Sequence, residues 1–93
     1  MTIKYIHFKS KEDQQHSVVS VGYRITPTNL EVQVARCRAP DLWCRRKSHL
    51  IVEGRFKKRG TLKSYTLDVL NHLSVLEVLE ADWHPDFGNE VIK

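Results

Sequence analysis

Two runs of alternating hydrophobic and polar residues, separated by a short polar stretch, constrain the fold of this chain more than any other feature. The runs are SVVSVGYRI at 17–25 and LEVQVARC at 30–37, and TPTN at 26–29 lies between them. A period of two is typical of a half-buried strand, because successive side chains point to opposite faces of a sheet. Proline and asparagine favour a turn in the polar stretch. We therefore predict an antiparallel hairpin.

The remaining segments predict one more strand, a short extended piece and two helices. The segment IKYIHF at 3–8 is rich in β-branched and aromatic residues, which favour a strand. TLKSY at 61–65 predicts a short strand or an extended link. With helices at 40–57 and 66–81, the order is that of an α+β domain. We expect a single domain with a small, mostly antiparallel sheet of three or four strands, packed by two helices on one face.

The first helix is predicted over 40–57. Proline is tolerated in the first turn of a helix, which suits Pro40, and Gly60 can end the helix after its basic last turn. Large apolar residues gather on one side of the predicted helix. The expected core contacts are Trp43, Leu50 and Ile51. Gly54 on the same side would let another element approach closely.

The second helix is predicted over 66–81, with Thr66 as its cap. Its apolar residues form a stripe near helical spacing. The stripe comprises Val69, Leu70, Leu73, Leu76 and Leu79. We expect it to cover the sheet, and its outer edge offers a contact for a homodimer. The segment after this helix is predicted to be irregular, with Trp83 and Phe87 folding back on the core.

Charge is distributed unevenly along the chain, whose net charge is +4. Residues 1–35 carry four bases and three acids, which gives +1. Residues 36–63 carry ten bases and two acids, which gives +8, whereas residues 64–93 carry one base and six acids, which gives −5. A uniform solubilising surface would not be sorted in this way. The pattern indicates a basic patch and an acidic end.

Contact with phosphate is the use that this charge favours. Six of the ten bases are arginines, which can bind a phosphate group through two donors. The predicted nucleic-acid-binding residues are Arg36, Arg38, Arg45, Arg46, Lys47, Arg55, Lys57, Lys58, Arg59 and Lys63. DNA is favoured over RNA as the ligand. The alternatives are a solvated face that pairs with the acidic end, and contact with an acidic protein surface. Base stacking is less favoured, since Tyr23 and Trp43 lie on apolar faces.

The sequence carries no signature of catalysis, and no cofactor or metal is expected. Asp41 and Glu53 are twelve residues apart on the predicted helix, about 18 Å along its axis, so they cannot share a metal ion. Cys37, Cys44 and His49 have the pattern C-x6-C-x4-H, which is wider than the usual pairs of a zinc site. We expect two reduced thiols. Neither a P-loop nor a dinucleotide fingerprint is present, so an enzyme is not predicted.

The stretch VARCRAPDLWCRRKSHLIVEGRF at 34–56 resembles small accessory proteins encoded by tailed bacteriophages and prophages. The resemblance lies in the Cys37, Asp41 and Trp43 run, the Arg-Arg-Lys triplet at 45–47 and the Glu-Gly-Arg sequence at 53–55. It covers about a quarter of the chain. It implies a non-enzymatic role in the bacterial cytosol.

This setting also supplies a rival function. The chain could be an inhibitor or regulator of host machinery, of the anti-defence or polymerase-modulating kind, whose basic patch meets an acidic surface or occupies a nucleic-acid channel. A structural component of a virion is a third reading. No apolar stretch approaches the ~20 residues of a membrane-spanning helix, and the polar amino terminus does not predict a signal peptide. We therefore expect a cytoplasmic protein without membrane contact.

Overall fold

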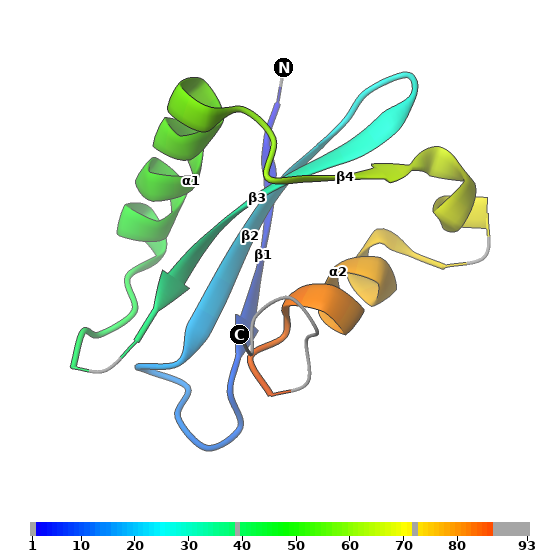
Figure 1. Cartoon of the computed structure of the whole chain (residues 1–93). Helices are drawn as coiled ribbons and strands as arrows, with labels where there is room; N and C mark the ends of the chain where they lie inside the picture. Colours follow the sequence, from blue (N-terminus) through cyan, green and yellow to red (C-terminus); the bar gives the residue numbers. More distant parts are fainter. Residues whose placement is uncertain (1, 39, 72, 87–93) are drawn as a thin grey trace.

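The computed structural model describes residues 2–38, 40–71 and 73–86 (Figure 1). Its elements are β1 (Lys4–Lys9), β2 (Val18–Ile25), β3 (Asn29–Cys37), α1 (Arg45–Arg59), β4 (Lys63–Thr66), the 3-10 helix η1 (Leu67–Asn71) and α2 (Val75–Trp83). The predicted α+β class is confirmed. Each of the first three strands lies within one residue of its predicted bounds, and the short segment after the first helix is a strand. None of the helices in the described ranges has the length and apolar character needed to span a membrane.

The four strands form one antiparallel sheet in the order β1-β2-β3-β4. β2 and β3 form the predicted hairpin, in which Ile25 pairs with Leu30 beside the turn. The backbone N–H of Thr26 closes this turn by donating to the carbonyl oxygen of Asn29 over 2.8 Å. Because strand side chains alternate, the register divides every strand into one set of residues for each face.

The two helices cover opposite faces of the sheet (Figure 1). The prediction that both would lie on one face was wrong. β2 is buried on both of its faces: Val19 and Val21 pack in the core with α2, whereas Gly22 faces Val52 of α1. A sheet whose small and apolar residues are buried on both sides needs a covering layer on each, so three layers result.

The larger core lies between the sheet and α2. Its buried members are Phe8, Val19, Val21, Leu30, Val32, Val34, Val78, Leu79 and Trp83. Trp83 is only 2% exposed, and its Nε1–H donates to the hydroxyl oxygen of Tyr65 over 3.0 Å. The predicted packing of Trp83 on the core is thus confirmed, while Phe87 lies outside the described residues.

The smaller core lies between the sheet and α1. Its buried members are Ala35, Val52 and Phe56, with Ile3 and Tyr5 packed against them. Gly22 permits the close approach of α1, because a Cβ at this position would overlap Cγ1 of Val52. Gly60 ends α1 as predicted: its φ is 74°, and its N–H donates to the carbonyl oxygen of Phe56 over 3.0 Å.

Helix α1 begins at Arg45, later than the predicted start at residue 40. The backbone N–H of Trp43 donates to the carbonyl oxygen of Gln15 over 2.7 Å, in the loop between β1 and β2. Cys44, the N-cap, is extended, with φ −132° and ψ 121°. The backbone before Arg45 is therefore held by tertiary contacts and not by helical ones, and Trp43 lies outside the helix.

The side of α1 that faces the sheet also differs from the prediction. Its buried residues are Ser48, Val52 and Phe56. Leu50 and Ile51, which were predicted to be core contacts, are 61% and 45% exposed. No atom lies within 4 Å of a Cβ built at Gly54, so the close approach occurs at Gly22 instead. The rotation of α1 follows from the space over Gly22, which accepts Val52 and turns Leu50 away from the sheet.

The single helix predicted over 66–81 was wrong. Thr66 ends β4, η1 follows it, and α2 begins only after Ser74. Ser74 and Glu77 form a capping box: the Glu77 N–H donates to Ser74 Oγ over 3.2 Å, and the Ser74 N–H donates to Glu77 Oε1 over 3.3 Å. This reciprocal pair satisfies donors at the start of a helix. It therefore starts a new helix where the leucine spacing had predicted a continuous one.

Candidate nucleic-acid interface

The solvent side of α1 carries most of the predicted phosphate contacts. Three buried residues at a spacing of four, Ser48, Val52 and Phe56, turn the opposite side of the helix to solvent. The exposed cations of α1 are Arg45, Arg46, Lys47, Lys57, Lys58 and Arg59, which we call the α1 cation face. Arg45 and Arg59, at its two ends, also line hollows beside the sheet. Glu53 is the one acidic residue within α1. The helix thus presents a dense positive charge to solvent.

The described residues provide no ion pair for the α1 cation face. The ion pairs among the described residues join His16 with Asp13, Arg24 with Glu31 and Lys63 with Asp82, and none of them includes a residue of this face. The acidic residues of α2 lie on the other face of the sheet, because α1 and α2 cover opposite sides. The sheet therefore separates the α1 cation face from the acidic residues of α2. Pairing with the acidic end does not account for this face in the part of the chain that is described.

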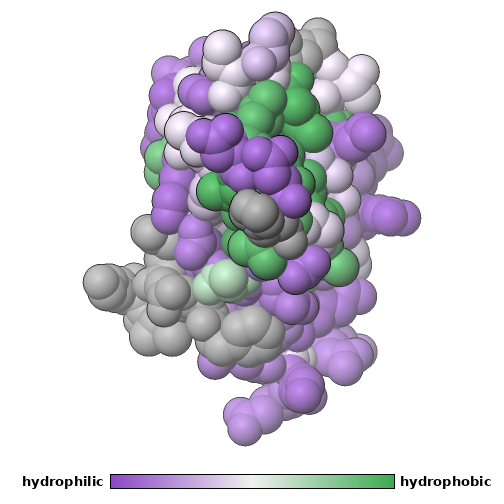
Figure 2. All heavy atoms as spheres, turned by 90° about the vertical axis from the view of Figure 1, so that its right-hand side faces the viewer, coloured by the Kyte–Doolittle hydropathy of each residue, from purple (hydrophilic) through white to green (hydrophobic). Residues whose placement is uncertain are grey.

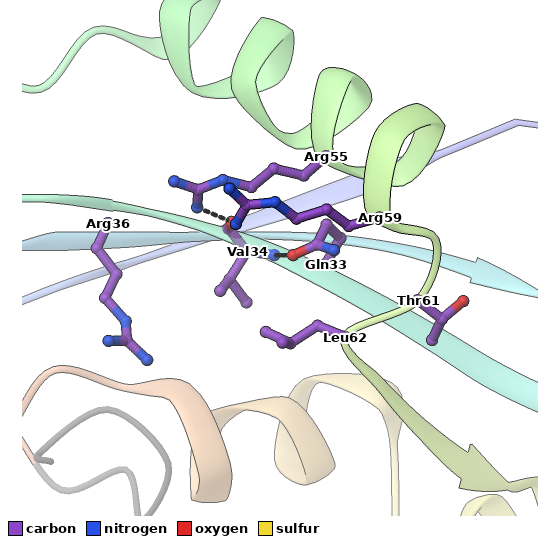
Figure 3. A pocket seen from close by; sticks show the side chains of 7 residues that line it. All are labelled: Gln33, Val34, Arg36, Arg55, Arg59, Thr61 and Leu62. Carbon is purple, nitrogen blue, oxygen red and sulfur yellow. Dashed lines mark hydrogen bonds between the residues drawn. The ribbon is translucent and has the colours of Figure 1, made fainter.

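A cleft of about 310 Å³ at the edge of β3 is lined by three of the predicted arginines: Arg55 and Arg59 reach over it from α1, whereas Arg36 points to the other side of the strand, toward α2 (Figure 3). β4 pairs with β3 only as far as Val32, so the later residues of β3 extend beyond it. Arg55 donates from Nη1 to the carbonyl oxygen of Val34 over 2.6 Å. Arg36 and Arg59 line the same cleft. The cleft places arginine side chains from α1 and β3, which are far apart in sequence, around one stretch of strand edge.

Gln33 occupies the same strand edge. Its Nε2 donates to the carbonyl oxygen of Gly60 over 3.0 Å, and its Oε1 accepts from the N–H of Val34 over 3.1 Å. Together with Arg55, this amide satisfies the backbone of Val34. Side chains that cap a strand edge discourage the addition of another strand. We therefore interpret this edge as a charged cleft and not as a site for strand pairing.

Lys63 does not join the other predicted residues. Its Nζ lies 2.9 Å from Oδ2 of Asp82 in α2, and the Tyr65 hydroxyl donates to the same oxygen over 2.6 Å. Burial acts to raise the pKa of Asp82, but the hydrogen bonds from Tyr65 and Lys63 outweigh it and lower that pKa. The ammonium group of Lys63 thus lies on the α2 side of the sheet. Arg38 is exposed in the segment after β3.

Sequence reasoning missed an aromatic cluster where β1 meets the start of α1. Tyr5 and His49 stack with ring centroids 3.7 Å apart and an interplanar angle of 9°. Nε2 of His49 lies 3.3 Å from Nε2 of His7, whose Nδ1 lies 2.8 Å from Oγ of the buried Ser20. The indole N–H of Trp43 donates to the same Ser20 oxygen over 3.0 Å. Trp43, predicted to be in the core, therefore lies in a polar and aromatic cluster.

The imidazole of His7 is held neutral by this environment. Burial lowers the pKa of His7 from 6.5 to about 4, and the nearby charges of His49, Arg45 and Lys9 add to the effect. A sequence signal for the cluster was the alternation in β1, which places Tyr5 and His7 on one face. Trp43 and His49 join this cluster only because α1 docks on the sheet beside β1. No local pattern in the sequence indicates that docking.

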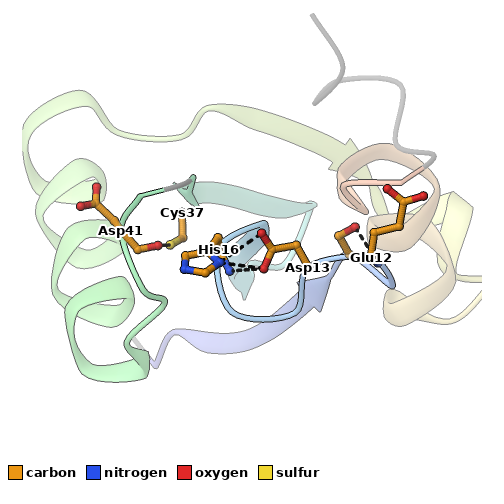
Figure 4. A network of polar contacts seen from close by, with 6 residues as sticks. Glu12, Asp13, His16, Cys37 and Asp41 are labelled. Atoms are coloured by element: carbon orange, nitrogen blue, oxygen red, sulfur yellow. Dashed lines mark hydrogen bonds and ion pairs between the residues drawn. The ribbon is translucent and has the colours of Figure 1, made fainter.

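The two cysteines, Cys37 and Cys44, are free thiols. The Cys37 thiol donates to the carbonyl oxygen of Asp41 over 3.2 Å, within the segment that leads into α1 (Figure 4). Cys44 is exposed at the start of α1. His49, the third residue of the spacing considered above, stacks on Tyr5. Among the residues described, no group of three or more His, Cys, Asp or Glu side chains converges in a way that could hold a metal ion.

The loop between β1 and β2 supports the segment that carries Trp43. Asp13 accepts from the backbone N–H of His16 over 3.0 Å and lies 2.9 Å from its ring Nδ1 (Figure 4). The carbonyl of Gln15, in the same loop, then receives the Trp43 N–H. The position of Trp43 is thus set by a loop that is itself folded by an aspartate.

Among the apolar side chains that reach the surface, two pairs lie on or next to the helices. Leu50 and Ile51 lie on α1, among its cations. Figure 2 shows the side of the molecule that lies to the right in Figure 1, where apolar residues form a band bordered by hydrophilic ones. Leu73 and Leu76, from the predicted apolar stripe of the second helix, are 44% and 51% exposed.

No protein-family model matches this chain, and neither a curated protein nor a solved structure matches it. The function is therefore inferred from the residues themselves.

Proposed function

We propose that this chain binds nucleic acid through the α1 cation face, extended by the arginine cleft at β3. The observation that carries the proposal is the density of exposed cations on α1, which have no ion-pair partner among the described residues. Clustered arginines and lysines neutralise phosphates and release bound counterions, which supplies affinity without base reading. In line with the phage-type resemblance, the proposed role is non-enzymatic and its setting is the bacterial cytosol.

The length of α1 and the spacing of its cations support contact along the phosphate backbone of a nucleic acid. α1 spans 15 residues, which corresponds to about 22 Å at 1.5 Å per residue. Arg46 and Lys47 lie near one end of the helix, and Lys57 and Lys58 lie near the other. A nucleic-acid strand that follows the helix would meet cations at both ends. Phosphate contacts of this kind position a ligand but do not specify its sequence.

The first experiment is fluorescence-polarisation binding to labelled single-stranded DNA, duplex DNA and RNA at about 50 and 200 mM salt. We expect affinity that falls steeply as salt rises, because each phosphate contact releases counterions. An absence of binding to all three ligands at the lower salt concentration would exclude the proposal.

Matched double variants locate the contact. Lys57→Gln with Lys58→Gln removes two cations of the α1 cation face, and Lys4→Gln with Lys11→Gln removes two cations from β1 and the following loop. Both changes lower the net charge by two. We expect only the first pair to reduce the slope of log affinity against log salt, by about 1.4 for a single strand or about 1.8 for a duplex. Equal effects of the two pairs would show that only overall charge matters.

A second candidate function is contact with an acidic protein surface, in keeping with the rival role of a host regulator. It is favoured by Leu50 and Ile51, which are exposed in the midst of cations beside a hollow of about 240 Å³ at Gly54. An apolar centre with a charged rim is typical of protein interfaces. Leu50→Ser should leave nucleic-acid affinity unchanged and abolish binding to such a protein. A homodimer would pair through the exposed Leu73 and Leu76, and sedimentation would show the mass of two chains.

A further inference from the structure

A hollow of about 570 Å³ lies at the edge of β1, beside the start of α1. Its lining residues are Tyr5, Ile6, His7, Lys9, Trp43 and Arg45. Three of these side chains are aromatic rings and two are cations. Aromatic faces next to cations are the combination by which proteins hold unpaired bases together with their phosphates. A volume of this size is within the range of small-molecule sites.

The rings of this hollow are held in place by contacts behind them. The indole N–H of Trp43 is fixed by Ser20, whose side chain is fully buried. The ring of His7 meets Trp43 edge-on, with centroids 4.9 Å apart and an interplanar angle of 62°. His7 is in turn held by Ser20 and His49. A stacking platform that is already ordered loses little conformational entropy when a base binds to it.

One face of the Trp43 ring is occupied by a group that can leave easily. Nζ of Lys9 lies 4.6 Å from the ring centroid. Lys9 is exposed, and the cation–π contact of an exposed lysine is weak. A base could take the place of the ammonium group on the ring, while Lys9 moves to the phosphate of the same nucleotide. Arg45, which also lines the hollow, begins the α1 cation face.

We infer that this hollow takes one unpaired nucleobase, stacked on Trp43 with its phosphate between Lys9 and Arg45, so that the chain prefers single strands to duplex. The inference rests on the proposed function and adds the class of nucleic acid. In a duplex the bases are stacked on one another and are not available to Trp43, whereas every base of a single strand has an exposed face. The remaining phosphates of the strand would lie along α1.

The test uses the two tryptophans as internal probes. Trp83 is 2% exposed in the core, whereas Trp43 lines the hollow. Titration of the wild-type chain with an oligothymidylate or oligouridylate of about 12 nucleotides, within the usual site size of a small domain, should quench Trp43 fluorescence. A duplex of equal length should quench it far less. The two single strands separate a DNA ligand from an RNA ligand.

Three variants then separate stacking from structure. Trp43→Leu should weaken single-strand binding by about 5- to 150-fold, which corresponds to the loss of one stacked base, and leave duplex binding unchanged. Trp43→Phe retains a ring and should keep most of the single-strand affinity, although it loses the bond to Ser20. Leu42→Ala, a change at an exposed neighbour, should have no effect.

The outcomes separate a failure of the base pocket from a failure of nucleic-acid binding as a whole. If the wild-type chain binds neither single strands nor duplex, the proposed function fails. If it binds both and Trp43→Leu binds single strands as tightly as the wild type, or weakens both ligands equally, the base pocket is wrong while the proposed function stands. If Trp43→Leu does not fold, the wild-type quenching and the Trp43→Phe variant still decide: equal quenching by single strands and duplex would overturn the inference.

Discussion

Gly22 is the position at which a single methyl group should disturb the fold most clearly. A Cβ built there overlaps Cγ1 of Val52 and lies 3.2 Å from Cγ2 of Ile3 and 3.4 Å from Cε1 of Tyr5. Val52 is completely buried, β-branched and part of α1, so relief of this overlap requires either an unfavourable rotamer or a shift of the helix. Gly22→Ala should therefore lower the free energy of unfolding by about 1–3 kcal/mol, the usual cost of overpacking a core.

The physical reason can be tested with a double-mutant cycle. Val52→Ala alone removes two methyl groups from the core and should cost about 2 kcal/mol. In the double variant, the new methyl group at position 22 enters the space that Val52 vacates. The two losses should then fall short of additivity by at least about 1 kcal/mol, as expected for residues in direct contact.

Urea denaturation followed by far-ultraviolet circular dichroism and by the fluorescence of the buried Trp83 measures each free energy. The dependence of that free energy on urea should be the same for all four proteins, because the surface exposed on unfolding hardly changes. A neutral Gly22→Ala variant, or strictly additive losses in the double variant, would show that α1 does not dock over Gly22. The placement of the α1 cation face would then be wrong as well.

Three further predictions concern single positions. Gly54→Ala should raise the free energy of unfolding by about 0.5–1 kcal/mol, because the added methyl group meets no atom within 4 Å and alanine favours a helix; a loss in urea melts would contradict the open surroundings of Gly54. Ser74→Ala should cost about 1 kcal/mol by removing the cap of α2, and Ser74→Asp, measured in parallel, should restore most of it. His7 stays neutral in the folded chain down to a pKa of about 4, whereas it takes up a proton near 6.5 when unfolded. Stability present above pH 6.5 should therefore be lost as pH falls toward 4, by about 1–2 kcal/mol after allowance for solvent screening, and His7→Gln should remove this part of the pH dependence; an unchanged pH profile of urea midpoints in that variant would refute it.

The strands and the charged segment were predictable from local patterns. Apolar and polar or small residues alternate at 19–25 in β2 and at 30–34 in β3, and this period of two predicts a strand without knowledge of what covers each face. Six of the ten cations of residues 36–63 are exposed on α1, so they lie on one helix wherever that helix packs. Lys63 and Arg36 are exceptions, because β4 carries Lys63 to Asp82 and the register of β3 places Arg36 on the face that packs against α2.

The helices were harder to predict because their apolar residues fit more than one arrangement. Leu50 and Ile51 are as hydrophobic as Val52, and only the space over Gly22 selects which of them faces the sheet. In the second helix, the residues of the capping box, Ser74 and Glu77, stand in the sequence, but the prediction over 66–81 rested on the leucine spacing and on Thr66. The start of α2 is thus determined by the local hydrogen bonds of the capping box and not by the spacing of the leucines.

By itself, the sequence determined the strands of the sheet, the end of α1 at Gly60 and the excess of positive charge, since each depends on neighbouring residues. The tertiary structure alone decided that the helices lie on opposite faces, because that choice depends on which face of the sheet each apolar stripe fits. It also decided that His7 meets His49 and that Trp43 meets Ser20. These contacts join residues 42 and 23 positions apart, so no pattern within one segment could encode them.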